Sequence, residues 1–353
     1  TSGFPDQRGL ADNETLVNFV RGQRGNEGFV AKDAVRLFRK RESILGDFVD
    51  AQPVFVKEPF ASYTDAGYAA FKTDLGVGGA NERKGMIYAA ANDGMLHAFY
   101  AGAVTVTGTP PTTVTTIDAT GGKEAWAFIP TMVLDNLYKL ADNDYANRHT
   151  FFVDGTPSIG DVYDTTATAW KTILVAGLNK GGKGYYALDV TDPDAPIALW
   201  EFKQSAICYN SSNSSTFGAD CNLGYSFGKP IITKLANGSW VALVTSGYNN
   251  VNGQTGDGEG FLYVLDAMTG QIISKVSTGV GDATTPSGLA QINNFVDNAL
   301  IDNTTKLVYG GDNEGNVWRF VVNELPDNPL TLPVDPVVAS ATLLGTTKDS
   351  TGV

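Results

Sequence analysis

Short runs of apolar residues recur along this chain, each of strand length and each bounded by glycine, proline, asparagine or aspartate. Four of them follow one another closely in the segment 156–202. The glycine-rich turn before Tyr185 predicts a hairpin that pairs the second run with the third. The segment is therefore predicted to form one antiparallel meander. Its strands are expected at 158–163, 171–178, 184–190 and 197–202.

The same order of four apolar runs recurs upstream and downstream of this meander. In each copy a glycine opens the third run: Gly94, Gly184, Gly260 and Gly315. A repeated four-stranded unit of roughly 45 residues has the size of a propeller blade. We expect an all-β fold, a β-propeller, with blades near 48–130, 151–202, 224–277 and 288–345 in a domain that spans 46–353.

The first 45 residues do not follow the strand pattern, so we expect an N-terminal arm with two short helices. Asn13 would cap one over 13–21, with Leu16, Val17 and Val20 on one face. The second would span 32–41, with its apolar residues inward and its basic residues, Arg41 included, outward. This arm is basic, and we expect it to dock on the acidic remainder of the chain.

Two further helices are predicted outside the strands. One short helix is expected over 60–72, within an excursion over 57–84 between two strands of the first blade. The segment 130–140 opens with a proline and carries a stripe of Val133, Leu134, Leu137 and Leu140, so it should pack on the propeller.

The net charge of −13 disfavours nucleic acid and anionic membranes as partners. No run approaches the roughly 18 apolar residues that a membrane-spanning helix needs, so no membrane span is expected.

Seven motifs, in order along the chain, closely resemble the PilC/PilY family of type IV pilus biogenesis factors, whose C-terminal region is a propeller. The resemblance implies a modified, quinoprotein-like propeller whose ring continues past this chain, so we expect an incomplete ring. It also implies an exported protein at the pilus tip or cell surface that promotes pilus extension, opposes retraction and contributes to adhesion. Expected partners are pilins, other assembly proteins and a host or surface receptor. The motifs are VNFVRGQRGNE, FRKRESILGDFVDAQPVFV, GMIYAAANDGMLHAFYAG, AWAFIP, FFVDGTPSIGDVY, GLNKGGKGYYALDVTDP and VYGGDNEGNVWRF.

Cys208 and Cys221 are the two cysteines of the chain, and they bracket a polar insert after the second blade. They are either two unrelated thiols or a disulfide that pins a surface loop. No histidine lies near them in sequence, which favours the disulfide and an oxidising compartment over a metal site.

No catalytic constellation stands out in the sequence. His97 and His149, the two histidines, are near no nucleophile in sequence and lack metal-ligand spacing, so we interpret both as structural. We expect no enzyme activity and no cofactor. The alternatives are a quinone-dependent dehydrogenase, which is also a propeller but usually has adjacent cysteines, and a generic cell-surface propeller that binds proteins.

The resembled family carries a calcium loop shortly before the strand that contains Tyr309. Its four ligand positions fall here on Asn298, Leu300, Asp302 and Lys306, and Leu300 and Lys306 cannot ligate calcium. We therefore expect this loop to fold without calcium, with the Lys306 ammonium paired to Asp302.

Overall fold

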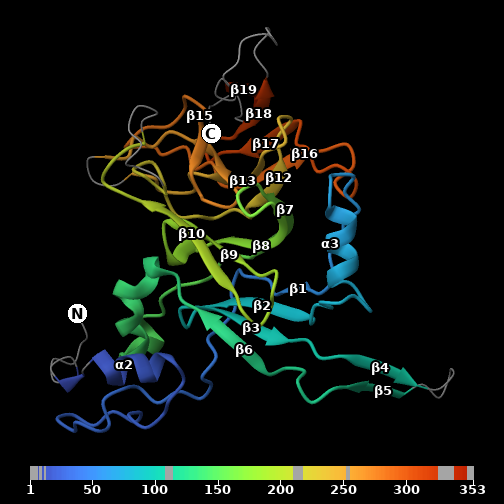
Figure 1. Cartoon of the computed structure of the whole chain (residues 1–353). Coiled ribbons are helices and arrows are strands. Elements are labelled where there is room, and N and C mark those ends of the chain that lie inside the picture. Colours follow the sequence, from blue (N-terminus) through green and yellow to red (C-terminus); the bar gives the residue numbers. More distant parts are fainter. Residues whose placement is uncertain are drawn as a thin grey trace.

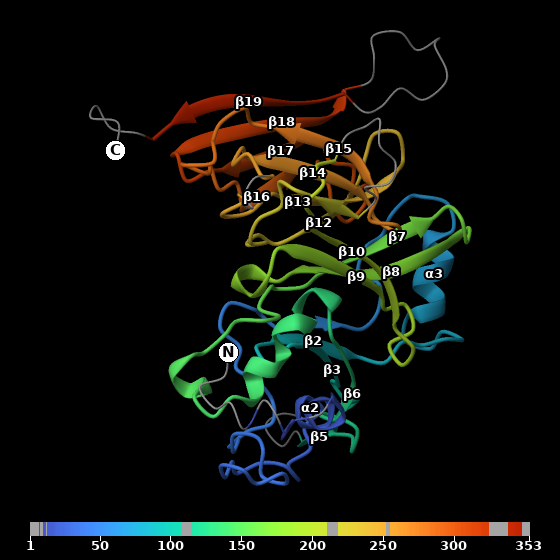
Figure 2. The same cartoon turned by 90° about the vertical axis from the view of Figure 1, so that its left-hand side faces the viewer.

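Four sheets, each built on four antiparallel strands, form the body of the chain, and they follow one another as blades in a stack (Figure 1). The computed structural model describes residues 7, 10–11, 13–107, 114–209, 218–251, 255–324 and 338–347. The first and the last blade stand at opposite ends of the stack in both views (Figures 1 and 2). The predicted all-β fold with propeller-type blades is confirmed.

The first blade pairs its strands in the order β1-β2-β3-β6. An unpredicted hairpin of β4 (Val104–Thr107) and β5 (Val114–Ile117) projects from it (Figure 1). The hairpin is inserted between the third and fourth strands of the blade, so it leaves their pairing intact. The strands of the blade are β1 (Val54–Val56), β2 (Met86–Ala91), β3 (Met95–Tyr100) and β6 (Glu124–Phe128).

The second blade is the meander predicted from the apolar runs, in the order β7-β8-β9-β10. A short fifth strand, β11 (Ala219–Asp220), adds to β10 in parallel and was not predicted. The glycine-rich turn before β9 contains one 3-10 turn, η3 (Asn179–Gly181). The blade's strands are β7 (Ser158–Asp164), β8 (Ala169–Gly177), β9 (Gly184–Asp189) and β10 (Ile197–Gln204).

The third and fourth blades repeat the pattern with consecutive antiparallel strands. The third consists of β12 (Ile231–Lys234), β13 (Trp240–Thr245), β14 (Phe261–Asp266) and β15 (Ile272–Ser277). The fourth consists of β16 (Ile292–Phe295), β17 (Leu307–Gly311), β18 (Asn316–Glu324) and β19 (Val338–Thr346).

The blades pack face to face, and this is why their inner strands are apolar on both faces rather than alternating. All six residues of β9 and all six of β13 are buried. The approach is close where Gly160 of β7 faces Ile232 of β12, because a Cβ atom at Gly160 would lie 2.8 Å from Ile232 Cγ2. Glycine at this position lets the second and third blades meet.

The arm docks on the first blade through apolar packing. Helix α2 (Asn13–Val20) buries Phe19 and Val20, which join one core cluster with residues of the first blade. Val17, predicted to share the apolar face, is 53% exposed. The ion pairs of the arm's described arginines join residues within the arm, whereas Arg39 donates a hydrogen bond to the Leu140 carbonyl of η1 at 2.6 Å.

The helix predicted over 32–41 is wrong, because this segment runs without regular structure. Leu37 and Phe38 are buried as expected, but Val35 is exposed. Arg41, expected to face solvent, is 5% exposed. A backbone bridge between Glu27 and Phe38 and an internal ion pair to Arg41 replace the helical hydrogen bonds.

The predicted helix after Pro130 exists as a 3-10 helix, η1 (Thr131–Ala141), which is followed by the short 3-10 turn η2 (Tyr145–Asn147). It buries Val133, Leu137 and Leu140 and contacts α2. Leu134, predicted to share the apolar stripe, is 50% exposed. Within the part of the chain that the structure describes, no helix is long and apolar enough to cross a membrane.

The excursion over 57–84, which we call the strap, ties the blades together from one side. It contains helix α3 (Tyr68–Leu75), which stands beside the stack opposite η1 (Figure 1). Tyr68 donates a hydrogen bond to Asp161 of the second blade at 2.7 Å, and Trp170 donates to the Ala66 carbonyl at 2.9 Å. The strap also reaches the third and fourth blades, so one insertion in the first blade contacts the other three.

Candidate functional site

The loop between β16 and β17 contains the four candidate calcium positions. Asn298 Oδ1 accepts a hydrogen bond from the Leu300 backbone N–H at 3.2 Å. Asp302 Oδ1 accepts from the Thr304 hydroxyl at 2.6 Å. Leu300 offers no side-chain oxygen and is 52% exposed. A calcium ion prefers six to eight oxygen ligands, and these residues, already engaged with the loop itself, do not fit one.

The predicted pairing of Lys306 with Asp302 is wrong. The Lys306 ammonium pairs with Asp297, the acidic residue just before the loop positions. Asp302 instead lies 3.2 Å from the ammonium of Lys234, at the end of β12. The sequence did not indicate Lys234, because 68 positions separate it from Asp302 and its neighbours read as an ordinary strand end.

Lys234 joins three parts of the chain. Its ammonium lies 2.7 Å from Asp65 of the strap and 3.2 Å from Asp302 of the fourth blade. Its side chain is 11% exposed. Two backbone hydrogen bonds add to this junction: Ser62 N–H donates to the Leu300 carbonyl at 2.7 Å, and Thr64 N–H donates to that of Ile301 at 3.2 Å. The Lys234 ammonium thus lies between two carboxylates, one of which belongs to a candidate calcium position, Asp302.

The electrostatic environment favours the charged forms of both Lys234 and Asp302. Burial disfavours the charged form of Lys234, but the hydrogen bonds and charges of Asp65 and Asp302 outweigh it and raise the pKa of the ammonium. The hydrogen bond from Thr304 lowers the pKa of Asp302 below its ordinary value, and the nearby Lys234 ammonium lowers it further. Partial burial of Asp302 acts in the opposite direction.

We predict that the loop does not respond to calcium. Calorimetric titration with calcium is expected to show no binding near micromolar concentration, and a chelator is expected to leave the melting temperature unchanged. A calcium-dependent rise in melting temperature that Asp302→Ala abolishes would contradict this prediction.

The two cysteines lie together beside β11. The sulfur atoms of Cys208 and Cys221 are 2.04 Å apart, as in a disulfide, and Cys221 is fully buried. Next to them, Asp220 Oδ2 forms a buried ion pair with Lys275 of β15 at 2.8 Å. The two bonded cysteines are 13 positions apart in the sequence.

We predict that Cys208 and Cys221 are joined in the protein isolated from an oxidising compartment. Peptide mapping without reductant should recover them in one cross-linked fragment. In the chain-entropy model, closing a loop of this length stabilises the fold by about 3 kcal/mol, so reduction should lower the free energy of unfolding. Two free thiols in the untreated protein would refute the pairing.

The two histidines are engaged with carboxylates rather than with a nucleophile. His97 of β3 is 4% exposed, with Nδ1 2.6 Å from Glu124 and Nε2 3.1 Å from Asp93. His149 Nε2 lies 3.0 Å from Asp47. Because both ring nitrogens of His97 face carboxylates, the doubly protonated imidazolium satisfies both contacts.

We predict a pH-dependent stability that arises from His97. Burial lowers the pKa of this ring, but Asp93 and Glu124 outweigh burial and raise it above its ordinary value of 6.5. The interaction therefore stabilises the fold fully below pH 6.5 and is lost as pH rises through the higher folded-state pKa. Unfolding free energies between pH 5 and pH 9 should show this loss on the alkaline side, and His97→Gln should remove it. The same alkaline loss in both proteins would argue against His97 as its source.

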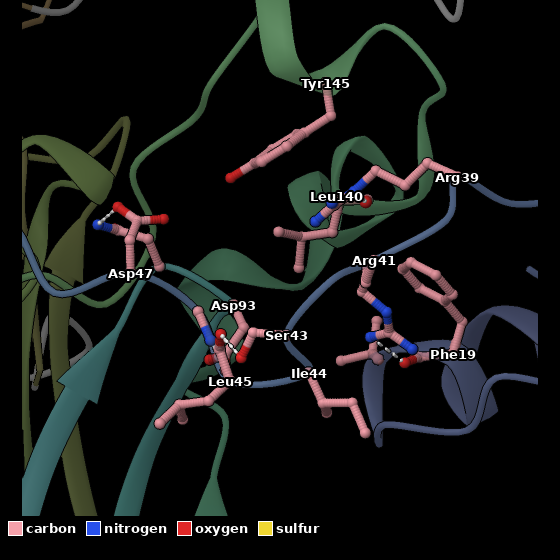
Figure 3. Close-up of a pocket in the computed structure, with 13 residues that line it drawn as sticks. Phe19, Arg39, Arg41, Ser43, Ile44, Leu45, Asp47, Asp93, Leu140 and Tyr145 are labelled. Carbon is pink, nitrogen blue, oxygen red and sulfur yellow. Dashed lines mark hydrogen bonds between the residues drawn. The ribbon is translucent and has the colours of Figure 1, made fainter.

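A small cavity lies between the arm and the first blade (Figure 3). Arg41 and Phe19 of the arm line one side, and Asp47, Asp93 and Tyr145 line the other (Figure 3). The cavity holds about 40 Å³, which is room for about one to three water molecules. This volume is too small for a substrate, and the residues around it serve to attach the arm.

The fold and these sites define a class. Four successive antiparallel blades with a docked N-terminal arm define a β-propeller domain.

The chain belongs to the PilY1 β-propeller family, because the model of the PilY1 beta-propeller domain matches residues 45–344. The type IV pilus biogenesis factor PilY1 of Pseudomonas aeruginosa strain PAK is 33% identical over 96% of this chain and 26% of its own length. A PilY1 homolog of Xylella fastidiosa strain Temecula1 is 33% identical over 86% of this chain and 19% of its own.

A solved structure agrees with these relatives. The crystal structure of the Pseudomonas aeruginosa PilY1 C-terminal domain is 29% identical, with a TM-score of 0.53 over 76% of this chain and 45% of that one. The chain spans about a quarter of the length of the Pseudomonas relatives. The comparisons support a pilus-related role and the propeller fold.

Proposed function

We propose that this chain is the propeller region of a type IV pilus biogenesis protein that promotes pilus extension, opposes retraction and contributes to adhesion. The similarity to PilY1, which extends over 96% of the chain, carries this proposal. The strap supports it structurally, because a region that transmits force between pilus and cell benefits from contacts that join successive blades.

We further propose that the protein is exported and reaches the pilus tip, where minor or major pilins, other assembly proteins and a surface receptor are its partners. A disulfide between Cys208 and Cys221 is consistent with an oxidising compartment. The net charge of −13 makes nucleic acid an unfavourable partner.

The proposed role is not enzymatic. Among the described residues, His97 and His149 both face carboxylates, and the two cysteines are bonded to each other. The alternative, a quinone-dependent dehydrogenase, makes a direct prediction: purified protein would carry a quinone absorbance and oxidise alcohols. Either finding would overturn our proposal.

Genetics tests the role in pilus dynamics. Deleting the gene should strongly reduce surface pili, and deleting the retraction motor as well should restore them if the protein opposes retraction. Complementation with the chain in its full-length context should return both piliation and surface attachment. Normal piliation after the single deletion would contradict the proposal.

A further inference from the structure

A basic cleft opens on the opposite side of the stack from the strap. It is lined by η1, by the loops before β7 and before β12, by the turn between β8 and β9, and by the end of β10. Its volume is about 850 Å³, near the upper end of the range for ligand-binding clefts. Five elements from separate parts of the sequence therefore converge on one concave surface.

Four lysines line this cleft: Lys139, Lys180, Lys183 and Lys203. None of the described residues that line it is a carboxylate. Their gathering is unexpected in a chain with a net charge of −13. A positive concave surface on an acidic protein attracts anionic groups locally while the remainder repels them.

The lysines are only partly neutralised within the described protein. Lys203 lies 3.7 Å from Glu201, whose carboxylate also accepts hydrogen bonds from Thr131. The Lys183 ammonium donates to the backbone carbonyl of Asn249 at 2.8 Å and has no acidic partner. Burial lowers the pKa of Lys183. An incoming carboxylate would stabilise its charged form.

The aromatic residues of the cleft limit the classes of ligand that it can bind. The Lys180 ammonium lies 4.9 Å from the centre of the Phe151 ring, and that of Lys183 lies 5.5 Å from the Tyr225 ring. These rings already face cations, so they are less available to stack on sugar rings or bases. Lysine is a point charge on a flexible stem, which suits separate carboxylates better than the two-pronged recognition that arginine gives phosphate.

We propose that this cleft binds an acidic polypeptide segment in extended conformation, with its carboxylates at the four lysines. The charge complementarity, together with aromatic rings that already face lysine ammonium groups, favours a peptide over a polysaccharide. The inference concerns the cleft alone and does not depend on the pilus role.

The test measures binding of a fluorescein-labelled eight-residue peptide that alternates glutamate with leucine. Fluorescence anisotropy with the folded chain should show saturable binding that weakens as salt rises. The double variant Lys180→Glu, Lys203→Glu should raise the Kd at least tenfold. The control Lys32→Glu, Lys123→Glu makes the same change in net charge at exposed positions outside the cleft, and it should leave the Kd within twofold.

Two results would overturn the proposal. One is an equal loss of binding in both variants, which would mean that net charge alone governs it. The other is tighter binding of a uronic acid oligomer than of the peptide, which would assign the cleft to a polysaccharide.

A second measurement uses the unaltered protein, so it does not depend on how the variants fold. A carbodiimide joins a carboxylate to a lysine amine as an amide and takes up the released water to become a urea. Mass spectrometry should locate peptide cross-links at Lys139, Lys180 or Lys203 and none at Lys32 or Lys123. Cross-links spread equally over all five lysines would contradict a specific cleft.

Discussion

Replacing Arg41 with methionine is expected to destabilise the docked arm by about 3–5 kcal/mol, the usual cost of removing one partner of a buried ion pair. The Arg41 guanidinium lies 2.7 Å from Glu27, and both side chains are nearly fully buried. It also donates to the carbonyls of Phe19 and Gln23, at 2.8 and 3.0 Å. Without Arg41, the buried Glu27 carboxylate would keep only the more distant Arg24, at 3.8 Å, and these carbonyls would lose their donor.

Low pH should weaken the ion pair between Arg41 and Glu27. Burial raises the pKa of Glu27, but the hydrogen bonds and charge of Arg41 outweigh it and hold that pKa below its ordinary value of 4.5. The pair therefore stabilises the fold above pH 4.5, and this contribution is lost as pH falls through the lower folded-state pKa.

Hydrogen exchange measured on peptides from 13–45 is the suitable readout, because the arm can open without unfolding the blades. Arg41→Met should accelerate exchange throughout the arm. Adding Glu27→Gln should recover part of the loss, since it removes the buried charge that Arg41 no longer balances. The matched control is Arg36→Met, whose pair with Asp33 at 2.7 Å is exposed and should contribute only about 0–1 kcal/mol. Equal exchange in Arg36→Met and Arg41→Met would refute the special role of Arg41.

Replacing Lys234 with methionine is expected to cost about 2–3 kcal/mol, less than a fully buried pair because Asp302 is 57% exposed. Loss of the Lys234 ammonium leaves Asp65 and Asp302 without their shared cation and removes one link between the strap and the fourth blade. Methionine keeps much of the apolar stem that packs toward Trp240, where the ammonium lies 5.8 Å from the ring centre.

Lys306→Met is the matched control for this prediction, since it removes an ammonium from the same loop. Its pair with Asp297 is exposed on both sides, so it should contribute only about 0–1 kcal/mol. Urea unfolding of the two variants, with and without calcium, separates the two lysines. A larger loss from Lys306→Met than from Lys234→Met would show that the loop depends on Lys306.

The blades were predictable from the sequence for a local reason. A run such as that of β13, which is apolar along its whole length and bounded by turn residues, forms a buried strand whichever neighbours cover it. Consecutive strands joined by short turns also pair with each other, so the order within each sheet follows the order of the chain. The repeat and the motifs of the resembled family then indicated the propeller.

The helices show where local pattern was insufficient. The segment 32–41 has helical spacing of apolar and basic residues, yet the buried pair of Arg41 with Glu27 and the backbone bridge at Phe38 compete successfully with helical hydrogen bonds. Intrinsic propensity differs by only tenths of a kcal/mol per residue, and tertiary contacts readily override it.

The strands, their pairing within blades, the resemblance to the family, and the lack of a side-chain oxygen at Leu300 and Lys306 could therefore be read from the sequence. The packing of the blades was needed to show that Lys234 pairs with Asp302 and that four distant lysines line one cleft. Lys234 forms an ion pair with Asp302, and Lys139 lines the same cleft as Lys203, although more than sixty residues separate the members of each pair in the sequence. The hydrophobic periodicity of a sequence indicates which face of its own strand or helix a residue occupies. Contacts between residues distant in sequence depend instead on how the blades and insertions pack on one another.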